Sequence, residues 1–307
     1  MRSPSPSAAA PEGRALVPTQ MFDRVTIVGV GLIGGSLGMA LRARGVAREV
    51  VGVTRAEASI VSARAARAID RGTVDPAAGV AGADLVVLAV PPDQVVPMAR
   101  RVAPHLQPGA LLTDVASVKA EIVESIEALL RPESGPAFVG GHPMAGNERQ
   151  GVAAASPDLF EGTAYLMTPT PRTPRGSVER LAGLARALGA IPLEVEPAEH
   201  DRMVALVSHL PYLVAAALMG TAGAAGPAAG PSLLGATRVA GSPVAMWAQI
   251  CRLNREPILD ALRAFRKELE RLETAIADGD RLDALLEAAR RARLRLGGAP
   301  SKGPDKG

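Results

Sequence analysis

Residues 24–38, RVTIVGVGLIGGSLG, decide the fold class that we expect for this chain. The stretch begins as a mostly apolar run rich in β-branched residues, turns at Gly29-x-Gly31-x-x-Gly34 and continues into a segment typical of a helix. In a dinucleotide-binding unit the first glycine permits the tight turn, and the second lets the backbone approach a pyrophosphate, which the helix N-terminus attracts. The order of strand, glycine loop and helix therefore predicts that a dinucleotide binds at Gly29, Gly31, Leu32, Ile33 and Gly34.

Apolar runs separated by amphipathic segments continue from this stretch to about residue 197. Continuous runs rich in β-branched residues, with helices between them, predict a parallel sheet that is covered on both faces. The strands are expected at 24–30, 49–54, 83–91, 109–117, 137–143, 164–170 and 191–197. The fold class is therefore α/β, with an N-terminal Rossmann-type doubly wound parallel sheet.

Beyond the last expected strand every long segment reads as a helix, at residues 197–220, 229–239, 243–275 and 279–295. We place a dinucleotide-binding domain at 23–175 and a mainly helical, all-α C-terminal domain at 176–295. The Pro-, Ser- and Ala-rich residues 1–22 are expected to form a disordered leader, and residues 296–307 a disordered tail.

The composition narrows the class of protein. With 34 basic and 31 acidic residues, the net charge of +3 gives little reason to expect a nucleic-acid partner. The single cysteine excludes an internal disulfide framework and a multi-cysteine metal site, so we expect no metal and a cytoplasmic location. Residues 203–220 are long and apolar enough for a membrane span, but Ser208, His209 and Pro211 at their centre favour a buried helix, so we expect no membrane partner.

The residues after the second expected strand bear on which dinucleotide binds. An acidic residue there would bind the adenosine ribose of NAD, whereas this chain has Thr54-Arg55. Because a guanidinium pairs bidentately with a phosphate, we favour NADP over NAD. The alternative is that Arg55 is a solvated residue at a helix start, with Glu57 close by.

Residues 138–146, FVGGHPMAG, place one of four histidines between a glycine pair and a proline, where an ordinary surface turn is one explanation. Ligands of doubly wound sheets, however, bind beyond the carboxyl ends of the strands, where we expect both His142 and Ser117. A neutral imidazole with a pKa of about 6.5 can accept a proton near neutral pH. We therefore predict that His142 is a general base, and that Gly140 and Gly141 clear space for the ligand.

The helical domain supplies further polar candidates, in VSHLPYL (207–213) and TRVAGSPVAMW (237–247). In a cleft between the domains Arg238 would hold a carboxylate, although a structural ion pair is the alternative. We expect a small anionic substrate, with candidate contacts at Arg238, Glu148, Ser208, His209 and Ser242.

The motifs GVGLIGGS, DVASVK, GGHPMAGNERQG, VSHLP and TRVAGSPVAMW occur in this order along the chain. In this order they resemble the prephenate/arogenate dehydrogenases of tyrosine biosynthesis, over about residues 23–290, and the chain is similar to the monofunctional members. HPMAG together with SHLP is far more specific than the glycine motif. The resemblance implies that the helical domain packs two copies into a homodimer.

The resemblance also implies the chemistry. Hydride leaves the ring carbon that bears the 4-hydroxyl of prephenate for the nicotinamide, and the ring carboxylate departs as carbon dioxide, which gives 4-hydroxyphenylpyruvate. His142 matches the histidine that takes up the hydroxyl proton, Ser117 the serine that orients that histidine, and Arg238 the arginine that holds a carboxylate. Positions lining the substrate pocket are matched by Glu148 and Ser242, and Ser208 and His209 are expected to line the cleft.

Two departures from the family pattern leave the substrate open. Where some prephenate-using members have SHLPH, this chain has Tyr212, and GVTR resembles NADP-using relatives that prefer arogenate. An arogenate or broader cyclohexadienyl dehydrogenase is therefore the first alternative. A β-hydroxyacid dehydrogenase would need a catalytic lysine that the 197–220 helix lacks, and a non-enzymatic dinucleotide sensor would leave the polar residues of the helical domain unexplained.

Overall fold

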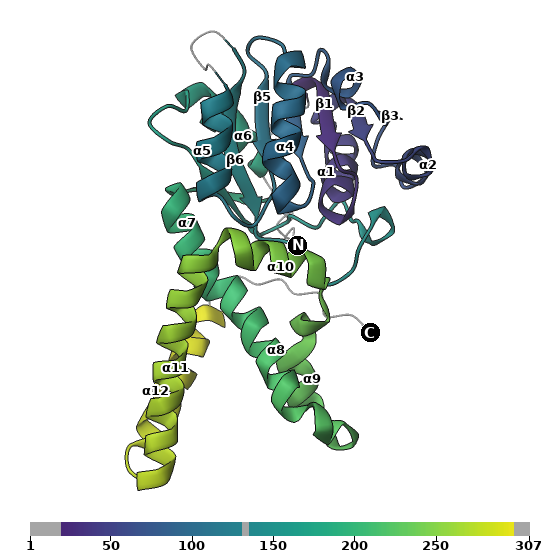
Figure 1. Ribbon diagram of the computed structural model, residues 1–307. Coiled ribbons are helices and arrows are strands. Elements are labelled where there is room, and N and C mark those ends of the chain that lie inside the picture. The colour runs from purple at the N-terminus through teal and green to yellow at the C-terminus, as the bar shows by residue number, and fades with distance from the viewer. Residues whose placement is uncertain (1–19, 131–134, 298–307) are drawn as a thin grey trace, which may run out of the picture.

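The computed structural model describes residues 20–130 and 135–297. A sheet covered by helices forms the upper part of the molecule in Figure 1, and long helices extend from its lower edge. This arrangement confirms the predicted α/β fold with a helical second part. The expected leader (1–22) and tail (296–307) lie outside the described residues, except for 20–22 and 296–297.

One eight-stranded sheet organises the first part. Its order is β3-β2-β1-β4-β5-β6-β7-β8, which over the first six strands is that of Rossmann folds. Every neighbouring pair from β3 to β6 is parallel, as predicted. The strands are β1 (Phe22–Val28), β2 (Ala47–Val53), β3 (Arg71–Thr73), β4 (Leu85–Leu88), β5 (Leu111–Asp114), β6 (Ala137–Pro143), β7 (Ala164–Thr168) and β8 (Ile191–Glu194).

Two features of the sheet differ from the prediction. β7 runs antiparallel to β6, because the connection between them contains only the 3-10 turn Val152–Ala154 and no helix that would return the chain to the starting edge. The sequence analysis also missed β3, since its three residues, RGT, form no apolar run. β3 is held by parallel pairing with β2.

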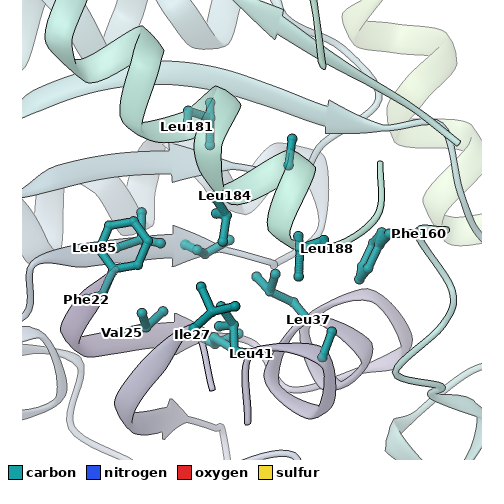
Figure 2. Close-up of a cluster of buried hydrophobic side chains, with 14 of the residues drawn as sticks. Phe22, Val25, Ile27, Leu37, Leu41, Leu85, Phe160, Leu181, Leu184 and Leu188 are labelled. Carbon is teal, nitrogen blue, oxygen red and sulfur yellow. The ribbon is translucent and has the colours of Figure 1, made fainter. Parts of the chain in front are cut away.

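Helices cover both faces of this sheet. Figure 2 shows Leu37 and Leu41 of α1, and Leu181, Leu184 and Leu188 from α6 and its C-terminal end, meeting the apolar side chains of β1 in one buried cluster. On the other face α4 and α5 pack in a second buried cluster. The helices of this part are α1 (Leu32–Ala43), α2 (Glu57–Ala65), α3 (Pro76–Val80), α4 (Pro92–Val102), α5 (Ala120–Leu129) and α6 (Arg175–Ala187).

The packing of β4 on both faces of the sheet explains why its sequence does not alternate between apolar and polar residues. Leu85 and Val87 belong to the first cluster and Val86 and Leu88 to the second, and all four are fully buried. Because successive side chains of a strand point to opposite faces, a strand between two helical layers must be apolar at every position.

The sheet extends past the predicted domain boundary at residue 175. α6 begins there and packs on β6, β7 and β8, and the last strand ends at Glu194. The proline-rich run 168–177 interrupts the sequence pattern, but it connects β7 with α6 inside the same unit. We therefore place the division between the two parts after Glu194.

The second part is helical, as predicted, and holds α7 (Pro197–Val204), the π-helical turn η3 (Ala205–His209), α8 (Leu210–Ala222), α9 (Pro231–Thr237), η5 (Arg238–Gly241), α10 (Val244–Leu253), α11 (Arg255–Asp278) and α12 (Leu282–Gly297). In Figure 1 α10 lies across the lower edge of the sheet, and two arms, α8 with α9 and α11 with α12, diverge below it. Ile250 of α10 belongs to the second buried cluster, so this helix joins the two parts.

Two of the predicted helices are interrupted. The helix expected at 243–275 divides at Asn254, because the buried Asn254 amide donates a hydrogen bond of 2.9 Å to the backbone carbonyl of Asp201. The helix expected at 197–220 contains the turn η3 just before Pro211, whose nitrogen has no hydrogen to continue the α-helical pattern. Both interruptions lie beside the polar residues described below.

The helical run Pro197–Ala222 is long and apolar enough to cross a membrane, and 22% of its most apolar window is buried. Its N-terminal portion contains the buried His200, Asp201 and His209. Asp201 accepts hydrogen bonds from the backbone at the start of α5. These contacts pack the N-terminal portion within the protein, whereas most of the apolar window is not buried, so the prediction of a buried helix holds for that portion alone.

The close packing of α1 on its own glycine loop predicts the effect of Gly34→Ala. A Cβ at residue 34 would lie 2.0 Å from the Gly29 carbonyl oxygen and 3.0 Å from Ile27 Cγ2. Overpacking of this kind costs about 1–3 kcal/mol, so urea unfolding is expected to show a loss of that size. Gly176→Ala is the control, because a Cβ there meets no atom within 4 Å; equal stabilities of the two variants would contradict the close contact.

Candidate active site

The loop between β1 and α1 has the shape that a dinucleotide requires. Gly29 has a positive φ of 95°, and a Cβ there would lie 2.3 Å from the Ala89 carbonyl oxygen. At Gly31 a Cβ would meet nothing within 4 Å, and no side chain caps the N-terminus of α1. Open space in front of uncapped backbone amides fits a pyrophosphate, which the helix N-terminus stabilises.

Thr54 and Arg55 lie directly after β2, where the ribose of a dinucleotide lies in this fold class. The Thr54 hydroxyl donates a hydrogen bond of 2.9 Å to the carbonyl of Ala56. Arg55 is exposed, and it makes no ion pair with any residue that the structure describes. The guanidinium is therefore available to an anion, and Glu57, which opens α2, does not bind it.

His142 lies on β6 with only 8% of its surface exposed. The two glycines before it make room for the protein's own side chains, and the prediction that they clear space for a ligand was wrong. A Cβ at Gly140 would lie 2.3 Å from Thr168 Oγ1, and a Cβ at Gly141 would lie 2.8 Å from the Asp114 carbonyl oxygen. The glycines thus let β6 approach its neighbours closely enough to bury the imidazole.

His142 is the first member of a buried chain of polar groups. Its Nδ1 lies 2.9 Å from Nε2 of His200, and Nδ1 of His200 lies 2.8 Å from Asp201 Oδ1. Asp201 also accepts hydrogen bonds from the backbone N–H groups of Lys119 (2.7 Å) and Ala120 (2.9 Å), at the N-terminus of α5. The sequence analysis missed His200 and Asp201. The signal for them in the sequence was the charged run EHDR at residues 199–202, which precedes an apolar helix.

Burial sets the protonation state of His142. Desolvation lowers its pKa well below the ordinary value, and the electrostatic interactions with His200, Lys119 and His209 act in the same direction. Burial also lowers the pKa of His200, an effect that the hydrogen bond to Asp201 opposes. At neutral pH His142 is therefore neutral and able to accept a proton.

Lys119 and Asp114 form a fully buried ion pair next to this chain of polar groups. Asp114 also accepts hydrogen bonds from the backbone N–H groups of Ala116 (3.0 Å) and Gly141 (3.2 Å). Burial lowers the pKa of Lys119, and the carboxylate of Asp114 opposes this shift. The pair holds the ends of β5 and β6 together, directly beside His142.

From the helical part, η3 contributes His209. Asn254 Nδ2 lies 3.0 Å from His209 Nδ1 and 2.9 Å from the Asp201 carbonyl oxygen, so Nδ1 accepts and Nε2 carries the hydrogen. Nε2 is buried, and the backbone of Ser117 lies within reach of the His209 ring. Burial lowers the pKa of His209 to about 4, and its ring meets the edge of Trp247, which stacks on Tyr212 at 3.8 Å.

Arg238 and Glu148 meet across the two parts of the molecule. Arg238 on η5 donates a hydrogen bond of 2.9 Å to Glu148 Oε2, in the loop after β6, and the two side chains are 63% and 40% exposed. The structure thus shows Arg238 in an ion pair, the alternative that the sequence left open, and this pair joins η5 to the loop after β6. Ser208 and Ser242 are half-buried in the helical part.

Ser117 is half-buried after β5, and its backbone adjoins the His209 ring. Within residues 20–130 and 135–297 the hydrogen-bond partner of the His142 ring is His200, and Ser117 makes no side-chain bond to it. No group of three His, Cys, Asp or Glu residues in these ranges could hold a metal ion.

Models of two known domains match this chain. Residues 37–192 match the nucleotide-binding domain of prephenate dehydrogenase, and residues 196–290 match its dimerization domain. The chain belongs to the prephenate dehydrogenase family. The junction between the two matches falls after β8, at the division that the sheet defines.

Relatives of this family align with nearly the whole chain. A prephenate dehydrogenase of Bacillus subtilis is 33% identical over 270 residues, which cover 85% of this chain and 72% of the relative. The solved structure of Aquifex aeolicus prephenate dehydrogenase in complex with hydroxyphenyl propionate and NAD+ has a TM-score of 0.81 and 30% identity, and the match covers 89% of this chain and 98% of that one. Synechocystis arogenate dehydrogenase has a TM-score of 0.77 and 32% identity, with 89% and 99% covered.

The open space at Gly31 predicts a variant that separates cofactor binding from stability. Gly31→Ala places a methyl group where the pyrophosphate of the dehydrogenase cofactor would lie, and overpacking of about 1–3 kcal/mol corresponds to an affinity loss of about 10- to 100-fold. Because no protein atom lies within 4 Å of that Cβ, the urea midpoint is expected to stay unchanged. Fluorescence titration with NADH and NADPH measures the affinity, with Gly176→Ala as the control; full affinity would place the pyrophosphate elsewhere.

Proposed function

We propose that this chain is a prephenate dehydrogenase, which catalyses the NAD(P)-dependent oxidative decarboxylation of prephenate to 4-hydroxyphenylpyruvate. The observation that carries the proposal is the neutral, buried His142 near the C-terminal end of β6, an inner strand of a dinucleotide-binding sheet. The loop that follows it approaches the start of α1, since a Cβ at Gly146 would lie 3.8 Å from Ile33 Cδ1. A base and a cofactor loop on neighbouring segments are what an alcohol oxidation needs.

The cofactor supplies the hydride acceptor when it is bound. Gly29, Gly31 and Gly34 shape the loop that would hold its pyrophosphate, and Leu32 and Ile33 begin the helix behind it. The Aquifex aeolicus relative in complex with NAD+ and hydroxyphenyl propionate supports a nicotinamide dinucleotide as the cofactor. For the 2′ position we infer a preference for NADP, because the free guanidinium of Arg55 suits a phosphate better than a hydroxyl.

The proposed substrate carries a hydroxyl and carboxylates, for which His142 and Arg238 are the candidate partners. His142 would take the 4-hydroxyl proton while hydride leaves the same carbon, and loss of the ring carboxylate as carbon dioxide completes the aromatic ring. A general base of this kind contributes about 10²- to 10⁴-fold to the rate. Arg238 would bind a carboxylate in exchange for Glu148, and His209 would line the cleft beside Ser117.

Three serines complete the proposed substrate site. Ser117, Ser208 and Ser242 are half-buried and come from the loop after β5, from η3 and from the turn before α10. We propose that Ser117 contacts the substrate hydroxyl. Ser208 and Ser242 then line the helical side of the pocket.

The test is nicotinamide reduction by the purified protein, with prephenate and arogenate each paired with NAD and NADP. Turnover with prephenate supports the proposal, and faster turnover with NADP supports the role of Arg55. Turnover with arogenate alone would replace it by the arogenate dehydrogenase alternative, which the Synechocystis relative makes the second candidate. Cofactor binding without turnover in any pairing would favour a dinucleotide sensor.

The role of His142 predicts a split between binding and turnover. His142→Asn is expected to lower kcat by about 10²- to 10⁴-fold, because the base is lost, and to leave the dissociation constant for NADPH unchanged. His105→Asn is the matched control, since His105 is an exposed histidine on the short turn Ala103–His105. Steady-state kinetics and fluorescence titration measure the two effects, and an active His142→Asn enzyme would refute the assigned role.

The groove between α8 and α11 supports a homodimer. It has a volume of about 630 Å³, and its apolar lining includes Leu213, Ala217, Leu218, Leu262, Phe265 and Leu269. Both helices lie within the segment that matches a dimerization domain, so we propose that a second copy covers it. Sedimentation equilibrium is expected to give twice the chain mass, and a monomer at all concentrations would contradict the proposal.

A further inference from the structure

We propose that His200 is a positioning residue for His142, which fixes the tautomer of the catalytic imidazole and receives its Nδ1 proton during turnover. The proton transfer from His142 to His200 rests on the proposed function. The tautomer of His142 does not, because it is a property of the ligand-free protein.

Asp201 sets the direction of the hydrogen bonds. Its two carboxylate oxygens accept from two backbone N–H groups at the N-terminus of α5, Lys119 N and Ala120 N. Backbone donors and the positive end of the helix dipole favour the ionised carboxylate. An ionised carboxylate only accepts, so the hydrogen in the 2.8 Å contact between Asp201 and His200 lies on His200 Nδ1.

The tautomer of His200 then determines that of His142. A neutral imidazole has one N–H, and His200 uses it toward Asp201, so its Nε2 is an acceptor. The 2.9 Å contact with His142 therefore requires a hydrogen on His142 Nδ1. As a result, His142 Nε2 carries the free lone pair of a general base.

His142 Nε2 is the atom that would face a substrate. It makes no hydrogen bond within the described residues, and it does not belong to the enclosed polar atoms without a partner. Nε2 therefore faces away from the chain of polar groups and is accessible to a ligand, even though only 8% of the surface of His142 is exposed. The tautomer set by His200 places the lone pair on this accessible atom.

The charges around the two rings favour His200 as the final position of the proton. Near His142 the ammonium of Lys119, just before α5, and the ring of His209 on η3 disfavour an imidazolium. Near His200, Asp201 on α7 and Asp114 on β5 favour a positive charge, and only Lys119 among the charged groups opposes it. An imidazolium at His200 lies against a carboxylate, whereas one at His142 does not.

The proton transfer balances. The substrate O–H bond breaks as an N–H bond forms at His142 Nε2, and the His142 Nδ1–H bond breaks as one forms at His200 Nε2. His142 ends neutral in its other tautomer, and His200 becomes an imidazolium that still donates to Asp201. Release of one proton to water from this pair, and return of His142 to its first tautomer, restores the starting state.

The first test reads the tautomer directly. Nitrogen-15 spectra of the histidine side chains in the ligand-free protein at pH 7.5 distinguish protonated from bare ring nitrogens, and single His→Gln variants assign the four residues. We expect His142 with hydrogen on Nδ1 and a bare Nε2, and in His200→Leu a loss of that preference. Hydrogen on Nε2 of His142 in the unaltered protein would overturn the proposal without any variant having to fold.

The second test separates proton transfer from positioning. His200→Gln can accept from His142 and donate to Asp201, but it cannot carry a proton. We expect kcat to fall by about 10- to 100-fold, as for outer-shell partners of functional imidazoles, with KM unchanged. The acid limb of the kcat profile is expected to move to lower pH, because the proton is then confined to the more buried, less basic His142.

The control for that series is His105→Gln, the exposed histidine, which should match the unaltered enzyme. If the acid limb of the kcat profile lies at the same pH in His200→Gln and in the unaltered enzyme, the role of His200 in proton transfer is overturned. This holds whatever the kcat of the variant. Absence of turnover by the unaltered enzyme would instead reject the proposed function, and the nitrogen-15 result would still decide the tautomer.

Discussion

The carboxylate of Asp201 is the contact on which the site depends. It accepts two backbone hydrogen bonds at the start of α5, and it binds the ring of His200. Its backbone carbonyl accepts from Asn254, where α10 and α11 meet. One buried residue thus fixes the first helix of the helical part against the sheet and, through His200, orients the imidazole of His142. Loss of an ionised, fully hydrogen-bonded carboxylate leaves several buried donors without partners, which is costly in a folded protein.

Burial explains how the same region can be both rigid and reactive. The Lys119–Asp114 pair is fully buried, and such a pair is held by geometry and added hydrogen bonds more than by net attraction. Its ammonium and the surrounding apolar layer keep His142 neutral. The exposed Arg238–Glu148 pair differs in kind, because water screens its charges and such a pair adds little to stability.

Local chemistry made part of this structure predictable. A strand, three spaced glycines and a helix are encoded within fifteen residues, so β1, the loop and α1 follow from the sequence, and the HPMAG motif led to His142. His200 and Asp201 were missed because their partners lie 58 and 82 positions away, and locally they read as the polar start of a helix. The glycines before His142 were misread for the same reason, since the atoms they accommodate, on Thr168 and Asp114, belong to neighbouring strands. The direction of β7 and the break at Asn254 likewise depend on contacts that no local pattern contains.

The most direct test of the account follows two labels through one reaction. Prephenate with deuterium on the carbon that bears the 4-hydroxyl, and carbon-13 in the ring carboxylate, is supplied with NADP or NAD. The account predicts one deuterium in the reduced nicotinamide for each labelled carbon dioxide released, because hydride transfer and decarboxylation belong to one site. Deuterated cofactor without labelled carbon dioxide, or carbon dioxide release without cofactor reduction, would contradict it.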